Sequence, residues 1–179
     1  MMKSTTAKLL LALSAIFAGK SARAVGQVPL QVVPSVDLAR YVGKWYEIAH
    51  LPAWFQRDCA GNTTATYTLR PDGKITVLNE CRNSGGVLKS AKGVAHIASS
   101  NGPNTKLKVT FFWPFYGDYW IMDLDSQYRW AVVGEPRRQY YWILSRTSQL
   151  DPTVYAQIIE RAKKQGYDLG PLQVTKQSY

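Results

Sequence analysis

The sequence has few of the side chains that metal sites and enzyme active sites use. It contains two histidines, His50 and His96, and two cysteines, Cys59 and Cys81, with no Cys-x-x-Cys or His-x-x-x-His spacing. We therefore expect no metal site, no cofactor and no catalytic residues. Basic runs and zinc-finger spacings are also absent, which argues against a nucleic-acid partner. These absences favour a binding protein over an enzyme.

Long apolar runs are absent after the first residues, since none approaches the roughly 20 residues that a membrane helix requires. The first residues contain the three regions of a secretion signal in their usual order. These are a basic region with Lys3 and Lys8, a short apolar core, and an A-x-A cleavage site that ends at Ala24. We expect a soluble, exported protein that lies in the periplasm and associates with the outer membrane. The predicted divisions are a signal peptide at 1–24, an extended N-terminal arm at 25–35 and one domain at 36–179.

Acidic residues are fewer than basic ones, 12 against 22, and the formal net charge is +10. Removal of the signal peptide takes away four cations and leaves a net charge of +6. A moderate positive excess favours peripheral contact with an anionic membrane surface or with an anionic ligand, although it would also serve solubility alone. The charge by itself does not separate these two interpretations.

The two cysteines fit one disulfide, which is their usual state in an exported chain. Asp72-Gly73 is a hairpin turn signal between two alternating segments, so Cys59 and Cys81 lie at the far end of the same hairpin. If Pro71 faces Lys74, Cys81 faces about Thr64, and a bridge requires the preceding chain to fold back. We predict a bridge between Cys59 and Cys81, with free thiols as the open alternative.

Short alternating segments recur at near-regular spacing and are separated by turn residues, which predicts an all-β fold: eight antiparallel strands in an up-and-down barrel. Asp151 at the N-cap, Pro152 at the first helical position and Gly166 after the last turn delimit one amphipathic helix packed outside the barrel. A short helical turn at 36–41 would plug the base. The predicted strands span about 44–50, 62–70, 74–82, 88–97, 106–113, 118–124, 129–134 and 140–146.

Alternation along the strands predicts which side chains face the barrel interior. A barrel of eight strands is either filled by its own side chains or holds one small ligand. Small residues on one part of the predicted wall and aromatic residues on the other favour a cavity, although core packing would account for any single aromatic. The predicted ligand-binding residues are Ala65, Tyr67, Val77, Asn79, Ala95, Val109, Phe111, Trp113, Tyr119, Ile121, Val133, Tyr140 and Trp142.

Successive turns of an up-and-down barrel lie at alternate ends. The loops at 51–62, 83–87, 113–118 and 135–139 should therefore lie at the same end, where they would frame the mouth. These loops carry both aromatic and arginine side chains. Such a rim suits a ligand with an apolar tail inside and an anionic head outside, although solvated loops also carry arginines. The predicted mouth residues are Trp54, Phe55, Arg57, Arg82, Phe115, Tyr116, Arg137 and Arg138.

Three segments resemble the signature segments of the lipocalins: Gly43-Lys44-Trp45-Tyr46-Glu47, Leu124-Asp125-Ser126-Gln127-Tyr128 and Ile143-Leu144-Ser145-Arg146. The chain is most similar to the bacterial outer-membrane lipocalins related to apolipoprotein D, and the resemblance runs over about 36–172. It implies that Trp45 packs on the barrel floor beneath Arg146. It also marks Gly43, Trp45, Tyr46, Asp125, Tyr128 and Arg146 as family signature residues.

The resemblance implies an exported carrier that holds a fatty acid or lysophospholipid for lipid storage or transport in envelope maintenance. Related bacterial proteins are often lipid-anchored through a cysteine at the cleavage point, where this chain has Val25. Three alternatives stay open: a lipocalin-type enzyme with a cavity thiol, a carrier of a retinoid, haem or sterol, and an adaptor with a filled barrel. The sequence also leaves open whether the chain forms a homodimer.

Overall fold

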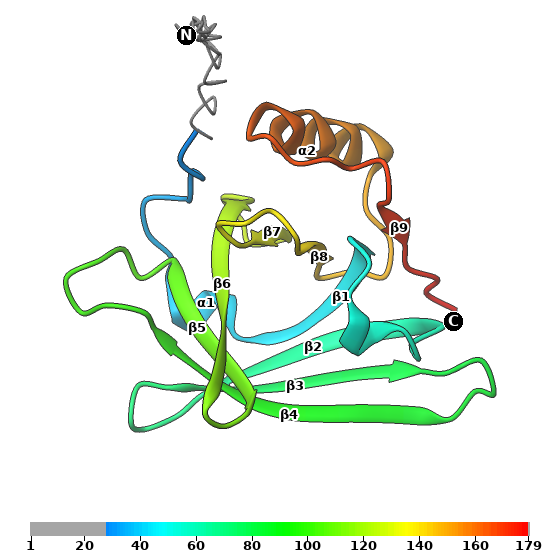
Figure 1. The fold of residues 1–179 in the computed structure, drawn as a ribbon, viewed down its shortest axis with the longest axis horizontal. Coiled ribbons are helices and arrows are strands. Elements are labelled where there is room, and N and C mark those ends of the chain that lie inside the picture. Colours follow the sequence, from blue (N-terminus) through cyan, green and yellow to red (C-terminus); the bar gives the residue numbers. More distant parts are fainter. Residues whose placement is uncertain (1–27, 179) are drawn as a thin grey trace, which may run out of the picture.

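Antiparallel strands close into an up-and-down barrel in the computed structural model, which describes residues 28–178 (Figure 1). Each strand from β2 to β7 pairs with the next in sequence, and β1 closes the barrel by pairing with both β8 and β2. The predicted signal peptide lies outside the described residues. The strands are β1 (Gly43–His50), β2 (Gly61–Leu69), β3 (Ile75–Arg82), β4 (Leu88–Ile97), β5 (Lys106–Phe112), β6 (Phe115–Leu124), β7 (Trp130–Gly134), β8 (Tyr141–Ser145) and β9 (Gln173–Val174).

The predicted amphipathic helix is α2 (Pro152–Lys164), and Figure 1 shows it along the outside of the barrel. The Asp151 carboxylate accepts hydrogen bonds from the backbone N–H of Thr153 and Val154, so it caps the first turn. Ile158 and Ala162 are buried in a hydrophobic cluster with residues of β1, β7 and β8. The eight predicted barrel strands and the external helix are therefore confirmed.

Two short helical segments lie at opposite ends of the barrel. The predicted turn at the base is α1 (Leu38–Tyr41), whose N-cap Asp37 accepts from two backbone N–H groups of the helix. A 3-10 helix, η1 (Trp54–Gln56), lies in the loop between β1 and β2. The chain before α1 is extended, and its Leu30 packs into the cluster beneath α2.

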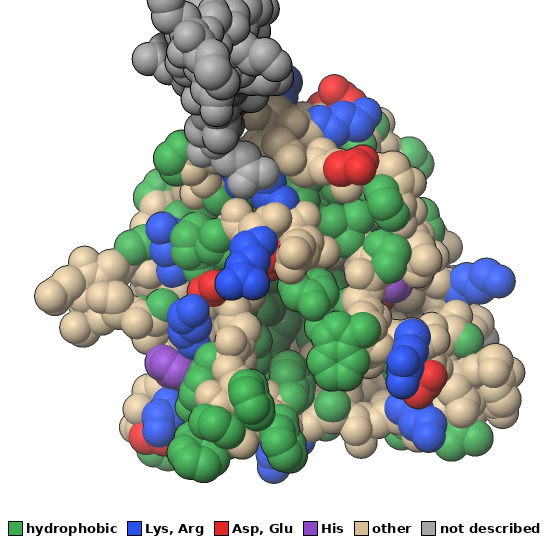
Figure 2. All heavy atoms as spheres, in the orientation of Figure 1, with side chains coloured by type: hydrophobic (Ala, Val, Ile, Leu, Met, Phe, Trp, Pro, Cys, Tyr) green, Lys and Arg blue, Asp and Glu red, His purple; other side chains and the backbone are tan. Residues whose placement is uncertain are grey.

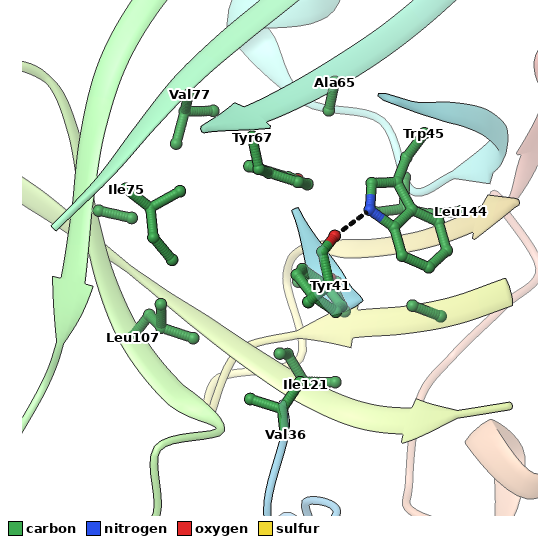
Figure 3. Close-up of a cluster of buried hydrophobic side chains, with 13 residues drawn as sticks. Val36, Tyr41, Trp45, Ala65, Tyr67, Ile75, Val77, Leu107, Ile121 and Leu144 are labelled. Carbon is green, nitrogen blue, oxygen red and sulfur yellow. Dashed lines mark hydrogen bonds between the residues drawn. The ribbon is translucent and has the colours of Figure 1, made fainter. Parts of the chain in front are cut away.

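The barrel floor is built around Trp45, which is completely buried (Figure 3). Its indole N–H donates to the carbonyl of Tyr41 at 2.8 Å, and the guanidinium of Arg146 lies 3.7 Å from the ring centroid. Arg146 also donates to several backbone carbonyls at the base, including that of Tyr128. Gly43 has φ +98°, and a Cβ there would lie 3.3 Å from the Arg146 guanidinium. Through these contacts, Arg146 joins the end of β8 to the start of β1.

The turn after β6 is held by Asp125. Its carboxylate accepts two hydrogen bonds from the Arg129 side chain, at 2.8 Å each, and further ones from the backbone N–H of Gln127 and Arg129. These bonds, the Arg129 side chain first, lower the pKa of Asp125 to about 2. Tyr128 accepts from the backbone N–H of Asp37, so this turn is tied to the start of α1.

The predicted disulfide between Cys59 and Cys81 is confirmed, with a Cα separation of 5.6 Å. The predicted hairpin register was wrong by one residue, because Thr64 pairs with Glu80 rather than with Cys81. A register shift then lies between Gly61 and Thr64, and the backbone N–H of Cys59 bonds the carbonyl of Gln56 in a turn. The irregular backbone brings the two sulfur atoms together.

A segment that the sequence pattern did not predict lies between β1 and β2, which are paired only over the first part of β1. We call residues 173–178 the closing segment; they include β9. On one side Thr175 donates from its backbone to the carbonyl of Ile48 in β1, at 2.9 Å. On the other side Asn62 of β2 donates to the carbonyl of Lys176, at 2.7 Å. The closing segment therefore fills the space where the two strands separate.

Candidate ligand-binding site

The barrel interior is apolar, and several side chains that face it are not fully covered. Figure 3 shows Ile75, Val77, Leu107 and Ile121 directed toward a common space. Val109 pairs with buried Ala95, and Tyr119 pairs with buried Leu107, so both belong to the inward-facing set. Val109 and Tyr119 are nevertheless only partly buried, as is Trp142. A barrel filled to the usual density of a protein core would cover them.

The barrel wall is least covered along β4. Strand β5 pairs only with the second half of β4, from Val94 to Ile97. Residues 88–92 of β4 are exposed at every position, whichever face of the strand they occupy. Figure 2 shows hydrophobic side chains in and around a hollow near the middle of the visible face. The interior is therefore accessible from the side on which β5 leaves β4.

Three tyrosine hydroxyls meet inside the barrel. The Tyr119 hydroxyl lies 2.7 Å from that of Tyr41 and 2.9 Å from that of Tyr67. Burial raises the pKa of Tyr67 to about 12 and places the pKa values of Tyr41 and Tyr119 well above the ordinary value. The three side chains are therefore neutral hydrogen-bonding groups at pH 7. Strand alternation could not have found Tyr41, because it belongs to α1.

Aromatic rings from the wall and from the mouth form one cluster. Trp142 and Tyr140 stack with ring centroids 5.9 Å apart, and Phe55 lies 5.5 Å from Tyr140 and 6.3 Å from Trp142. Trp54, which is 74% exposed, contacts Phe55 at the outer end. The structure thus brings together two predicted wall residues and two predicted mouth residues.

A buried carboxylate orients this cluster. Glu47 is 4% exposed and accepts hydrogen bonds from the side chains of Gln56, at 2.7 Å, and Thr175, at 2.6 Å. His50 Nδ1 lies 3.0 Å from the same carboxylate. The amide oxygen of Gln56 in turn accepts from the Trp142 indole N–H at 2.9 Å. Sequence reasoning missed Glu47 and Gln56, since no pattern links a strand carboxylate to a loop amide.

Two predicted wall residues lie near the end of the β5–β6 hairpin. Phe111 and Trp113 are 43% and 76% exposed, and both line a pocket with Thr76, Val94 and Thr110. A Cβ on Gly93, which pairs with inward-facing Val77, would lie 2.8 Å from the Phe111 ring, so Phe111 keeps the face of Val109. Trp113 follows a register shift between Val109 and Phe112, where the pairing with β6 is interrupted. The assignment of both residues to the ligand site stays a prediction.

The remaining predicted wall residues keep inward positions. Ile121 and Val133 are completely covered, while Ala65, Tyr67, Val77 and Ala95 are buried in the interior cluster. Asn79 pairs with Ala65 and Ala91, so it shares their face. Its side-chain oxygen is buried and has no hydrogen-bond partner. The polar groups of the described wall are thus the tyrosine hydroxyls, this amide and the Glu47 carboxylate, whose residue pairs with inward-facing Leu144.

The four predicted mouth arginines differ in their surroundings. Arg57 and Arg137 are exposed, and exposed Arg82 donates to the carbonyl of Gly86 at 2.7 Å. Arg138 instead donates to the backbone carbonyls of Gln165, Val28 and Pro136, so it holds its loop against the end of α2. Its assignment to a ligand headgroup stays a prediction. The predicted mouth residues Phe115 and Tyr116 lie in the β5–β6 hairpin, where Tyr116 contacts His96.

The described residues offer little for catalysis. Residues 28–178 contain no group of three or more His, Cys, Asp or Glu side chains able to hold a metal ion. The sulfur atoms of the two cysteines, Cys59 and Cys81, are bonded to each other, which leaves no thiol for a thiol-based mechanism. Within the same residues, every helix is too short or too polar to cross a lipid bilayer. The apolar interior suits the binding of an apolar molecule.

Comparisons with known proteins give one family. The model of the lipocalin-like domain matches residues 36–177. Temperature-induced lipocalin-1 of Arabidopsis thaliana is 43% identical over 156 residues, 83% of each chain. Outer membrane lipoprotein Blc of Escherichia coli (strain K12) is 40% identical over 139 residues, 77% of each chain. Insecticyanin from the tobacco hornworm Manduca sexta has the same fold, with a TM-score of 0.66 at 21% identity and 84% of each chain covered.

Proposed function

The chain belongs to the lipocalin family, whose members bind small hydrophobic ligands, and on that premise we propose that it is an exported carrier of a fatty acid or lysophospholipid. The observation that carries the proposal is the set of apolar, inward-facing side chains that stay partly exposed, above all Val109, Tyr119 and Trp142. Its role would be the storage or transport of lipid in the cell envelope. A periplasmic location at the outer membrane fits the name of the relative Blc.

The division of the site into an apolar interior and a basic rim favours an amphiphile over a wholly apolar ligand such as a sterol. Each methylene group that enters the barrel contributes about 0.8 kcal/mol, so affinity should rise with acyl length until the space is full. An anionic head near exposed Arg57, Arg82 or Arg137 gains only about 0–1 kcal/mol per contact, because water and salt screen the charges. The tail therefore dominates the affinity.

Replacing Trp142 with alanine is expected to weaken binding of a long-chain fatty acid or lysophospholipid at least tenfold. The change removes a ring from the aromatic cluster at the entrance. Arg137→Ala should weaken binding less than fivefold and should alone reduce the salt dependence of the affinity. Isothermal titration of each variant with a series of acyl lengths measures both effects.

The control is Trp142→Phe, which keeps an aromatic ring in place but removes the hydrogen bond to Gln56. It should bind nearly as tightly as the wild type. Affinity that is independent of acyl length, or that the arginine change alone abolishes, would contradict the proposed site. Native mass spectrometry of freshly purified protein tests the adaptor alternative, because a carrier should retain lipid and a filled barrel should not.

We further propose that the carrier meets its lipid at an anionic membrane surface through the aromatic tip, which we define as Phe112, Trp113, Phe115 and Tyr116. These side chains are 75%, 76%, 71% and 46% exposed, an unusual concentration for apolar groups on a monomer surface. Figure 2 shows hydrophobic side chains gathered at the end of the β5–β6 hairpin. Arg70 and Lys92 line the pocket beside Trp113, where they could contact anionic headgroups.

The double variant Trp113→Ser/Phe115→Ser is expected to lose at least tenfold in partitioning onto vesicles of phosphatidylethanolamine and phosphatidylglycerol. Insertion of two rings into the membrane interface should contribute more than the 1.4 kcal/mol that a tenfold change requires. Flotation of the vesicles with bound protein measures the partitioning. Val28→Ser, which removes an apolar group that is 66% exposed at a distant position, should have no effect. Equal partitioning of all three proteins would refute membrane contact through the tip.

A further inference from the structure

The hydroxyls of Tyr41, Tyr119 and Tyr67 form a hydrogen-bonded row inside the barrel, which we call the tyrosine chain. One of its three hydroxyl hydrogens has no acceptor within the row. Each hydroxyl has one hydrogen to donate and can accept two hydrogen bonds. The chain of Tyr41, Tyr119 and Tyr67 contains two hydrogen bonds, which use two of its three hydrogens. None of the three hydroxyls donates to any other acceptor among the described residues 28–178. One O–H group is therefore available to a bound molecule.

Loss of a proton does not remove this spare donor at neutral pH. Burial is the largest influence on all three side chains; it raises the pKa of Tyr67 to about 12 and the pKa values of Tyr41 and Tyr119 well above the ordinary value. The chain consequently presents a neutral O–H donor throughout the physiological range.

A spare acceptor lies on the adjoining part of the same wall. The side-chain oxygen of Asn79 is buried and accepts no hydrogen bond. Tyr67 pairs with Val77, and Ala65 pairs with Asn79, so Tyr67 and Asn79 are diagonal neighbours on the inner face. Diagonal neighbours on one face of an antiparallel pair lie about 7–8 Å apart. Tyr67 and Asn79 therefore direct their polar groups to the same side of the wall from adjacent strands.

The neighbours of Asn79 leave room for such an atom. Ala65 lies beside it on β2 and Ala91 lies beside it on β4, and neither side chain reaches beyond its Cβ. The other side chains directed into this space, such as Val77 and Ile75, are apolar. A polar group of the ligand would thus find its partners where the tyrosine chain and Asn79 lie, because the Glu47 carboxylate already accepts hydrogen bonds from Gln56 and Thr175.

We propose that the barrel selects lipids whose acyl chain carries a hydroxyl group, and that Tyr67 and Asn79 determine this specificity. A hydroxyl is the simplest group that accepts one hydrogen bond and donates another, so it satisfies the spare donor and the spare acceptor together. A keto group could only accept, and an unsubstituted chain could do neither. This inference rests on the proposed carrier function and names the class of lipid that the carrier takes.

The test compares hexadecanoate with a series of monohydroxyhexadecanoates in which the hydroxyl lies at different carbons. One position should bind about tenfold more tightly than hexadecanoate, which is the order expected for two neutral hydrogen bonds. Other positions should bind more weakly, because they bury a hydroxyl without partners. The lysophospholipid that carries the preferred hydroxyacyl chain, measured in parallel, separates a preference for the free acid from a preference for the acylated headgroup.

Two conservative variants assign the effect to the named residues. Tyr67→Phe and Asn79→Leu should each reduce the preference, measured as the ratio of the two affinities of the same variant, from about tenfold to less than threefold. Tyr155→Phe is the matched control, since it removes a tyrosine hydroxyl of α2 outside the barrel, and its preference should be unchanged. Thermal unfolding of each variant verifies that it is folded.

The possible failures are distinguishable. If hexadecanoate binds but no hydroxylated isomer binds more tightly, the specificity inference is wrong and the carrier function stands. If a hydroxyl preference exists but neither Tyr67→Phe nor Asn79→Leu changes it, the assignment to these residues is overturned. If no fatty acid or lysophospholipid binds at all, both the inference and the proposed function fall.

Discussion

Replacing Trp45 with alanine is expected to lower the free energy of unfolding by about 3–5 kcal/mol, the range for a large aromatic residue removed from a core. The Trp45 ring is completely buried on the barrel floor. Its loss would leave the carbonyl of Tyr41 without the indole donor and the guanidinium of Arg146 without the ring beneath it. The apolar, cation–π and hydrogen-bond contributions all act in the same direction.

Chemical denaturation followed by circular dichroism measures this loss. Trp54→Ala is the control, because Trp54 is 74% exposed in the loop between β1 and β2. That change should cost less than about 1 kcal/mol, as is usual for surface positions. A Trp45→Ala protein as stable as the control would mean that Trp45 does not form the floor.

Removing the disulfide is expected to cost about 3 kcal/mol in the double variant Cys59→Ala/Cys81→Ala. The bridge joins residues 22 positions apart, and in the chain-entropy model a closed loop of that length restricts the unfolded chain by this amount. The bridge also fastens the loop after β1 to the end of β3. Its removal should therefore loosen the mouth as well as lower the global stability.

Unfolding of the wild-type protein with and without a reductant, beside the double variant, provides the measurement. The reduced wild type should resemble the variant, and the oxidised wild type should be more stable than both. Intact-mass analysis after alkylation adds a direct check of the bond. Two alkylatable thiols in protein prepared from an oxidising compartment would contradict the bridge.

Local patterns in the sequence were sufficient for most of the fold. The strands follow from period-two alternation and turn residues, and α2 follows from Asp151, Pro152 and its helical spacing. Both signals act within a few residues of one another, so they need no knowledge of distant contacts. The floor was predicted through the family resemblance, which supplied the pairing of Trp45 with Arg146 over about one hundred residues.

Features that depend on irregular or distant contacts were not predicted. The pairing at the end of the β5–β6 hairpin is one such feature, because a register shift lies between Val109 and Phe112. The tyrosine chain joins α1, β2 and β6, and only the closed barrel brings these elements together. The local sequence does not distinguish Glu47 from any other carboxylate on a strand, because Thr175 and Gln56 surround it only after the chain has folded.

The closing segment covers backbone groups that would otherwise form open strand edges. Where β1 and β2 separate, their backbone N–H and C=O groups would form open strand edges, which are templates for pairing with another chain. The closing segment occupies that slot, and the Gln177 side chain donates to the carbonyl of Glu47 on one strand and to that of Thr63 on the other. Gly61 permits this fit, since a Cβ there would lie 2.6 Å from the carbonyl oxygen of Lys176. The molecule thus supplies its own partner strand, and the slot is closed to a strand from a neighbour.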